Sequence, residues 1–327
     1  MKPPAIEFFE GPAVPDAPVA RGLPQPEDLA PESESPDGRI FAFDDGMVAG
    51  FAALWWRDTP CNEGERVAAI GGFGAVDETV TKYLLDAATT MLHGMGFRMV
   101  VGPMNGNTWR RYRFVTESNG RGPFLLEPRN PDSYPDWWRA AGFEEIAYYS
   151  SSTISLNGQP TVPDALRKRL LRSGVKIRTL NPTKYEEEMR SIHSVCLKSF
   201  SANFLYTPLS EEAFVGAYSK LKDRIDPDLV RIAERDGVVC GFVFAIADLE
   251  AAARGEKPAL IIKTLAVDPG ARCPGLGSIL VDEVQNLGFE KGFSTALHAL
   301  QHDENTVLRI TSRHHGETFR RYTLFAR

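Results

Sequence analysis

The chain has 327 residues and a formal net charge of −6; 43% of its residues are hydrophobic and 24% are charged. This balance is typical of a folded protein large enough for two domains. The sequence has no apolar run of about 18 residues, so no membrane-spanning helix is expected, and no long basic run, which argues against a nucleic-acid partner. The four cysteines form no CxxC pair and the opening MKPPAIEFFEGP lacks the pattern of a secretion signal. We therefore expect a cytoplasmic protein without a bound metal or a disulfide framework.

Residues 1–36 are rich in proline, which fixes φ and removes a backbone donor, so we expect an N-terminal arm without packed elements. Residues 37–157 are predicted to form a first domain that opens with a hairpin turned at Asp44-Asp45-Gly46. Apolar residues at helical spacing from Val80 to Met95 predict a helix. The other expected elements are strands at 66–75 and 98–102, an irregular segment at 107–128, a short helix at 134–141 and a final pair of strands in 144–156.

Residues 158–174 are predicted to be a linker, and residues 175–327 a second domain. Its expected elements are strands at 175–180, 259–267 and 294–300, a hairpin of 229–234 with 238–247, and helices at 182–199, 210–221 and 278–287. Both halves contain a hairpin, a strand, a helix that ends near a Gly-Phe pair and a further strand, followed by an Asn-Thr pair. This self-similarity predicts a duplicated domain; two unrelated α+β units are the alternative.

The stretch most informative about function follows the strand that ends at Val267. It runs Asp-Pro-Gly-Ala-Arg-Cys-Pro-Gly-Leu-Gly from Asp268 to Gly277 and leads into a helix. The first turn of a helix leaves backbone N–H groups unpaired and carries a partial positive charge. Glycines 275 and 277 let a phosphate approach these groups without a Cβ in the way, and Arg272 adds a cation. The pattern predicts a pyrophosphate site, but it fits neither a P-loop nor the dinucleotide fingerprint.

The spacing from Val267 and Pro269 through Arg272 to Gly275 and Gly277 is similar to the V-x-P-x-x-[QR]-x-x-G-x-[GA] signature of GNAT acyltransferases. The resemblance implies an α+β protein of two GNAT-like domains, each with a mixed, mostly antiparallel sheet flanked by helices. It also implies acetyl-CoA or another acyl-CoA as cosubstrate, with the pyrophosphate on the amides of 272–278. The coenzyme contacts that it implies are Leu265, Val267, Arg272, Gly275, Leu276, Gly277, Ser278 and Asn305.

The resemblance further implies that an amine attacks the thioester directly while a backbone N–H holds the thioester carbonyl, so no metal is needed. The family usually has a tyrosine as general acid at the position that Ser312 occupies here, and serine is a poor acid. His298 and Tyr322 are the substitutes considered for this acid, and Glu234 is considered as a general base acting through water. For His298 and Glu234 a purely structural role is the alternative.

The first half lacks the arginine-glycine spacing in its equivalent loop. Asp77 and Glu78 are expected to cap the following helix and to repel a phosphate. Because no strand-helix-helix opening precedes the hairpin, we predict a truncated, degenerate GNAT-like domain without coenzyme. Trp109 and Trp137-Trp138 are interpreted either as the lining of a substrate cleft between the domains or as a packed interface.

These observations predict an acyltransferase that moves an acetyl or other acyl group from acyl-CoA to an amine of a small molecule or a peptide. A non-catalytic acyl-CoA-binding or sensor protein is one alternative, motivated by Ser312. An aminoacyl transferase similar to the tandem-GNAT Fem proteins is another, against which the intact coenzyme loop and the acidic net charge count. The sequence leaves the acceptor, the acyl chain and the oligomeric state open.

Overall fold

A computed structural model describes residues 3–219, 222–303, 308–313 and 315–327. In the first half of the chain the elements are β1 (Ala5–Glu10), α1 (Pro26–Leu29), η1 (Glu32–Glu34), β2 (Gly38–Asp44), β3 (Met47–Trp55), β4 (Cys61–Asn62), β5 (Glu65–Arg66), β6 (Ala68–Ala75), α2 (Glu78–Gly94), β7 (Val100–Gly102), β8 (Phe114–Ser118), α3 (Tyr134–Ala140) and β9 (Glu144–Ser155). In the second half they are α4 (Asp164–Arg172), β10 (Val175–Thr179), η2 (Pro182–Lys184), α5 (Tyr185–Phe200), α6 (Glu211–Ser219), η3 (Lys222–Arg224), η4 (Pro227–Leu229), β11 (Val230–Arg235), β12 (Val238–Ala247), α7 (Leu249–Ala253), β13 (Leu260–Val267), η5 (Pro269–Ala271), α8 (Leu276–Glu290), β14 (Thr295–His302), α9 (Leu308–Arg313) and β15 (Glu317–Ala326).

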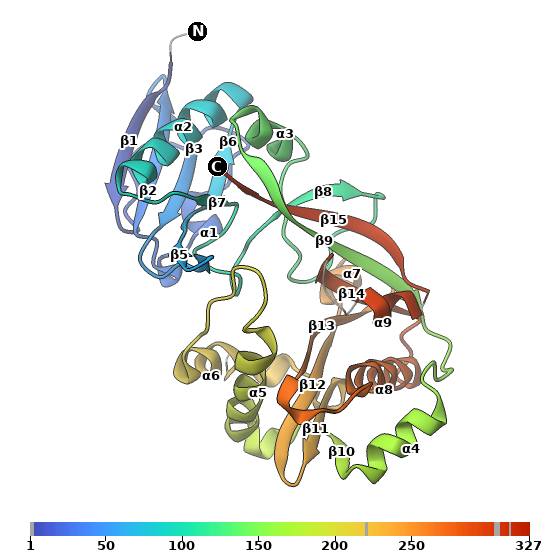
Figure 1. The fold of residues 1–327 in the computed structure, drawn as a ribbon. Helices are drawn as coiled ribbons and strands as arrows, with labels where there is room; N and C mark the ends of the chain where they lie inside the picture. The colour runs from blue at the N-terminus through green and yellow to red at the C-terminus, as the bar shows by residue number, and fades with distance from the viewer. Residues whose placement is uncertain (1–2, 220–221, 304–307, 314) are drawn as a thin grey trace.

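One mixed, mostly antiparallel sheet runs through two lobes of the molecule, with helices on its faces (Figure 1). Its strand order is β1-β2-β3-β6-β7-β15-β9-β14-β13-β12-β11-β10, and β8 pairs with β15. The predicted α+β class is thereby confirmed. Among the described helices, none combines the length and the apolar character needed to cross a membrane.

The two lobes repeat one arrangement of strands. In the first lobe β1, β2, β3 and β6 pair antiparallel in that order, α2 follows, and β7 pairs parallel to β6. In the second lobe β10, β11, β12 and β13 do the same, α8 follows, and β14 pairs parallel to β13. The repeat predicted from the sequence is therefore present in the sheet.

The lobes are joined by two long strands that cross the middle of the molecule. β9 (green) and β15 (red) run side by side in Figure 1 and pair antiparallel. β9 also pairs with β14 of the second lobe, and the C-terminal strand β15 pairs with β7 of the first lobe. The two lobes thus share one continuous sheet, while the domain limits drawn from the sequence stay a prediction.

Two predictions for the N-terminal region were wrong. The proline-rich segment contains packed structure, because β1 pairs with β2 and the buried Ala30 lies against Gly72 and Ala53. The first lobe therefore does have an opening strand before its hairpin, in the place that β10 takes in the second lobe. The prolines around this segment concealed β1 in the sequence analysis. None of them lies within Ala5–Glu10, so the strand can form, and it pairs on one edge only.

Other differences concern elements that depend on distant partners. Residues 144–155 form one long strand rather than a pair, and β8 lies within the segment expected to be irregular. The predicted linker contains α4. β15 has no counterpart among the predicted elements, although Phe325 and Tyr322 on it are fully buried.

Each lobe has its own core. Phe73, Phe114, Tyr134 and Trp138 pack edge to face under α2 and α3 in the first lobe, so Trp138 belongs to the core rather than to a cleft. In the second lobe α8 covers one face of the sheet, and α5 and α6 cover the other. The strand β13 therefore lies between two packed layers.

Candidate active site

The predicted pyrophosphate loop forms a tight connection between β13 and α8. Asp268 accepts a hydrogen bond from the Gly270 amide (2.8 Å), and Lys198 donates to the same carboxylate (2.9 Å). Arg272 (φ 49°) and Gly275 (φ 89°) both adopt the left-handed conformation, which turns the chain sharply into the helix. Gly275 is the N-cap and α8 has no side-chain cap. The Leu276 amide donates to the Cys273 carbonyl (3.1 Å), and no side chain at the N-cap accepts from the first helical turn.

The two glycines of the loop serve different purposes. A Cβ on Gly275 would lie 2.8 Å from Cδ2 of Leu166, and the positive φ also favours glycine, so the local fold itself requires this residue. A Cβ on Gly277 would meet nothing nearer than Cδ2 of Leu265 at 3.5 Å. Ile310 (3.6 Å) and Val267 (3.8 Å) would also be in ordinary van der Waals contact, so packing does not require a glycine at 277.

Arg272 provides a cation in the same loop. Its side chain is exposed, and within the described part of the chain it has no ion-pair partner. Leu265 and Val267 are partly exposed on the strand that leads to the loop, while Leu276 and Ser278 are buried in the first turn of α8. Asn305, the remaining predicted coenzyme contact, lies outside the described residues.

The strands β13 and β14 separate beside this loop. They pair in parallel only from Leu260↔Ala296 to Ile262↔His298. Beyond that point β13 continues to Val267, whereas β14 pairs with β9 alone. Among the described residues, the backbone of β13 from residue 263 onward has no paired strand on its β14 side, so backbone groups there could bind a ligand.

Lys263 lies where the two strands begin to separate. It is the extra residue of a β-bulge, because the pairing of β12 with β13 shifts between Phe244↔Thr264 and Ala245↔Ile262. Burial, and then the nearby charge of Arg113, lower the pKa of Lys263 to about 8. An amine with this pKa is neutral in roughly a tenth of molecules at pH 7 and in about half at pH 8, far more than an ordinary lysine, and the neutral form can accept a proton.

Arg113 belongs to the first lobe and is only 6% exposed. Its guanidinium lies 4.0 Å from the ring centre of Tyr112 and 4.1 Å from that of Tyr149. Its Nε and Nη1 atoms are buried without a hydrogen-bond partner. This fixed charge stands next to a lysine, so it favours the neutral amine of Lys263.

Tyr322, on β15, is the one predicted catalytic residue that lies next to this group. Its ring centre is 5.8 Å from the Arg113 guanidinium. Its hydroxyl donates to Glu127 Oε1 (2.5 Å) and contacts Ser151 Oγ at 2.9 Å. Burial raises the pKa of both Tyr322 and Glu127. The phenol is fully buried and stays protonated, so this arrangement fits a structural hydrogen bond better than an acid that meets a substrate.

The other predicted catalytic residues have their own surroundings; His298 is opposite Ile262, the residue before Lys263, on the neighbouring strand. His298 is buried, with Nδ1 2.8 Å from Thr311 Oγ1 and Nε2 2.9 Å from Gln285 Nε2. Glu234, at the far end of β11, accepts a hydrogen bond from Arg178 Nε (2.9 Å). Ser312 is exposed on α9. Their catalytic roles stay predictions.

The sequence analysis missed Lys263 and Arg113. Lys263 is a single charged residue inside the apolar strand Leu260–Val267, a pattern that could have marked it. Arg113 gave no such signal, because it stands in a segment with several arginines and its burial depends on tyrosines from β9 and β15.

Comparison with known proteins agrees with the geometry. Residues 190–309 match the model of the acetyltransferase (GNAT) family. This span contains the separated strands, the loop and α8. The second half of the chain therefore contains a GNAT-family domain, and this domain carries the family motif.

Two curated proteins are similar to part of the chain. Protein YghO of Escherichia coli is 24% identical over 192 residues, which are 56% of this chain and 48% of that protein. The bacterial ceramide synthase of Caulobacter vibrioides is 27% identical over 195 residues, 55% of this chain and 50% of that protein. The chain thus spans about half the length of these relatives.

Solved structures share the fold over most of the chain. A tandem GNAT protein from the clavulanic acid biosynthesis pathway has a TM-score of 0.53 at 12% identity, covering 99% of this chain and 98% of that one. A GCN5-related N-acetyltransferase from Sphaerobacter thermophilus also has a TM-score of 0.53, at 14% identity, covering 88% of this chain and 80% of that one. The fold is therefore that of two GNAT-like domains.

Proposed function

We propose that this protein is an acyl-CoA-dependent N-acyltransferase with one coenzyme site, in its second lobe. The observation that carries the proposal is the start of α8, which has no side-chain cap, follows a separated strand and has a glycine at 277 that packing does not require. A pyrophosphate would accept hydrogen bonds from the amides of 272–278, with Arg272 beside it. Leu265 and Val267 would offer backbone groups to the pantetheine arm, and Asn305 is proposed as a further contact.

Lys263 is proposed as the general base. It lies two residues before Leu265 on the same strand, where an acyl thioester on this coenzyme path would end. Its neutral amine takes a proton from the ammonium of the acceptor; the amine nitrogen then forms a bond to the thioester carbon. As the C–S bond breaks, the thiolate leaves and takes up the proton that the nitrogen loses. The products are an amide and free CoA.

The departing thiolate needs little assistance, because a thiol has an ordinary pKa of about 8.5. Ser312, His298 and Tyr322 therefore need not supply an acid, and Glu234 need not supply the base. The thioester carbonyl is already activated toward an amine, so the proposed reaction requires no metal. We propose that the protein acts in the cytoplasm, because its four cysteines are free thiols.

The acceptor is proposed to be a small-molecule or peptide amine. The relative named bacterial ceramide synthase supports formation of an amide, because a ceramide is an N-acylated long-chain amino alcohol. A long-chain amino alcohol is accordingly the first acceptor to test. A sensor protein would bind acyl-CoA without turnover, and a Fem-like enzyme would use aminoacyl-tRNA.

Calorimetric titration with acetyl-CoA and CoA tests the coenzyme site. We expect saturable binding at one site per chain, followed by release of free thiol when an accepted amine is added. Binding without thiol release across a panel of amines would favour the sensor alternative. No binding at millimolar coenzyme would contradict the proposal and leave only a GNAT-like fold.

A further inference from the structure

We propose that the C-terminal half of α4 binds the phosphate on the 3′ carbon of the ribose of CoA, with Arg169 as its ligand beside Arg272 of the coenzyme loop. The proposal rests on the proposed acyltransferase function and deepens it, because it names a residue by which the protein distinguishes CoA from a coenzyme without this phosphate. The helix concerned lies within the predicted linker, and the proposed pyrophosphate site does not use its cations.

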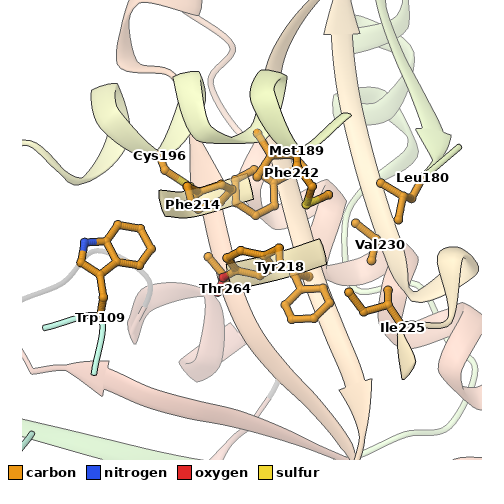
Figure 2. A pocket seen from close by; sticks show the side chains of 12 residues that line it. Trp109, Leu180, Met189, Cys196, Phe214, Tyr218, Ile225, Val230, Phe242 and Thr264 are labelled. Atoms are coloured by element: carbon orange, nitrogen blue, oxygen red, sulfur yellow. The ribbon is translucent and has the colours of Figure 1, made fainter. Parts of the chain in front are cut away.

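One face of the second-lobe sheet offers no place for a charged ligand. On this face the apolar side chains of α5 and α6, among them Met189 and Phe214, pack closely on β11, β12 and β13 (Figure 2). Trp109 of the first lobe belongs to this layer: its ring packs edge to face on Phe214, and its Nε1 donates to the Thr207 carbonyl (2.7 Å). Trp109 is thus part of a packed interface and does not line a cleft. Because burying a charge among apolar groups is costly, the phosphates of the coenzyme are expected on the other face, which α8 and α4 cover.

The helix α4 lies directly against the coenzyme loop. A Cβ on Gly275 would be only 2.8 Å from Cδ2 of Leu166, so the helix closely approaches the start of α8. At the C-terminal end of α4, Ser173 Oγ accepts a hydrogen bond from Arg235 Nη2 (3.2 Å), while Arg235 Nη1 donates to the Ala271 carbonyl of the loop (2.9 Å). These two contacts hold α4 along the loop.

Arg169 lies between the two contacts on the same side of the helix. It follows Leu166 by three residues and precedes Ser173 by four, and residues at these spacings lie one above another on a helix. The side chain of Arg169 is exposed, and so is that of Arg172, one turn further on. Arg169 therefore meets the solvent beside the coenzyme loop, where a ligand on the amides of α8 would be bound.

The cations on this side of α4 lack acidic partners. Arg167, which faces α8, forms ion pairs with two carboxylates of that helix. By contrast, none of Arg169, Arg172 and Arg235 forms an ion pair with a residue that the structure describes; the contacts of Arg235 are a carbonyl, a hydroxyl and a thiol. Asp164, the acidic residue of α4, lies in the first turn, at the other end of the helix. The positive charge beside the loop is therefore available to an anionic ligand.

The phosphates of CoA are spaced in a way that fits this arrangement. The pyrophosphate is attached to the 5′ carbon of the adenosine ribose, and a third phosphate is attached to the 3′ carbon of the same ribose. The two groups are therefore less than about 10 Å apart, which is the diameter of a helix with its side chains. With the pyrophosphate at the start of α8, the 3′-phosphate reaches the neighbouring helix α4. The planar fork of a guanidinium matches the oxygens of a phosphate, so Arg169 can donate two hydrogen bonds to it.

Calorimetric titration with CoA and with dephospho-CoA, which lacks only the 3′-phosphate, tests the proposal. We expect CoA to bind roughly tenfold more tightly at low ionic strength, and this ratio to fall with added salt, because exposed charges are screened. Arg169→Gln should remove most of the difference by weakening the binding of CoA, while the affinity for dephospho-CoA stays unchanged. Lys168→Gln is the matched control, because Lys168 is an exposed cation on the same helix but points away from the side of Leu166.

The two ligands separate this inference from the function on which it rests. Equal affinity of the native protein for CoA and dephospho-CoA would overturn the inference and leave the acyltransferase function standing. Binding of neither ligand at millimolar concentration would contradict the proposed coenzyme site and the inference with it. If Arg169→Gln weakened both ligands equally, Arg169 would support the fold of the loop instead of the phosphate, and the inference would fail. Binding to phosphatidylglycerol vesicles that depends on Arg169, without a preference for CoA, would assign these cations to a lipid phosphate and overturn the inference as well.

Discussion

The two lobes share a strand order but begin their crossover helices differently. In the first lobe Asp77 caps α2 by accepting a hydrogen bond from the Val80 amide (2.8 Å), as the sequence predicted, and Glu78 lies in the first turn. In the second lobe Gly275 precedes α8 and no side chain caps the helix. A carboxylate in one lobe thus occupies the position that a phosphate would need, and the other lobe leaves it open.

The space between the two parallel strands, β6 and β7 in the first lobe and β13 and β14 in the second, also differs between the lobes. In the first lobe the amide of Met104 donates to the Ile70 carbonyl (2.8 Å), and Asn105 Oδ1 accepts from Gly72 (2.9 Å). A Cβ on Gly71 would lie 2.3 Å from that oxygen, so the space is filled by the chain itself. In the second lobe Leu265 stays partly exposed along the corresponding strand.

Both lobes also keep a β-bulge at this place. The pairing of β3 with β6 shifts beside Gly72, and the pairing of β12 with β13 shifts at Lys263. The bulge carries a glycine in one lobe and a lysine with a lowered pKa in the other. The comparison teaches that two lobes with one strand order differ in the helix cap, in what fills the space beside the strand and in the side chain at the bulge.

The largest expected effect is on CoA binding, and it distinguishes the start of α8 from the start of α2. Gly277→Glu places a carboxylate beside the amides of α8, where like charge repels the pyrophosphate, so binding of CoA should be abolished. Asp77→Ala in the first lobe should leave the affinity unchanged. Calorimetric titration of both variants measures the contrast; equal loss in the two would show that the coenzyme was assigned to the wrong lobe.

Removing the bulge lysine should be the next largest effect. Lys263→Met should lower kcat/KM by roughly 10²- to 10⁴-fold, the usual contribution of a general base, while the affinity for CoA is retained. Lys82→Met, an exposed lysine on α2, is the matched control in the first lobe. Full activity of Lys263→Met would remove the lysine from the mechanism.

The pH dependence of kcat/KM should reflect the protonation of Lys263. A base acts when it is neutral, so kcat/KM should rise with pH and level off above a pKa of about 8. Arg113→Gln removes a positive charge that disfavours the protonated amine, so the rising limb should move to higher pH. Arg111→Gln, at an exposed neighbour, is the control. A rising limb that stays in place would show that Arg113 does not act on this base.

The smallest expected effects concern stability. Asp77→Ala should lower the free energy of unfolding by about 1 kcal/mol through loss of the cap. Gly275→Ala should cost roughly 1–3 kcal/mol, because its left-handed conformation and the contact with Leu166 both oppose a Cβ. Urea unfolding measures both changes. If Gly275→Ala left the free energy of unfolding unchanged, the loop would be able to adopt another backbone conformation.

The sequence by itself determined the local parts of this protein. The strand up to Val267, the turn through Gly275 and the start of α8 follow each other within a few residues, so propensity, turn chemistry and spacing suffice to predict them. The same holds for the hairpin at Asp44-Asp45-Gly46 and for the cap at Asp77.

Only the tertiary structure decided which distant parts meet. β15 joins β7 across more than half of the chain, and Arg113 approaches Lys263 from the other lobe. The burial of Arg113 is created by Tyr112 and Tyr149, and the lowered pKa of Lys263 follows from desolvation and that neighbouring charge. Desolvation and charge proximity are properties of the packed chain, which residue types and spacing do not encode locally.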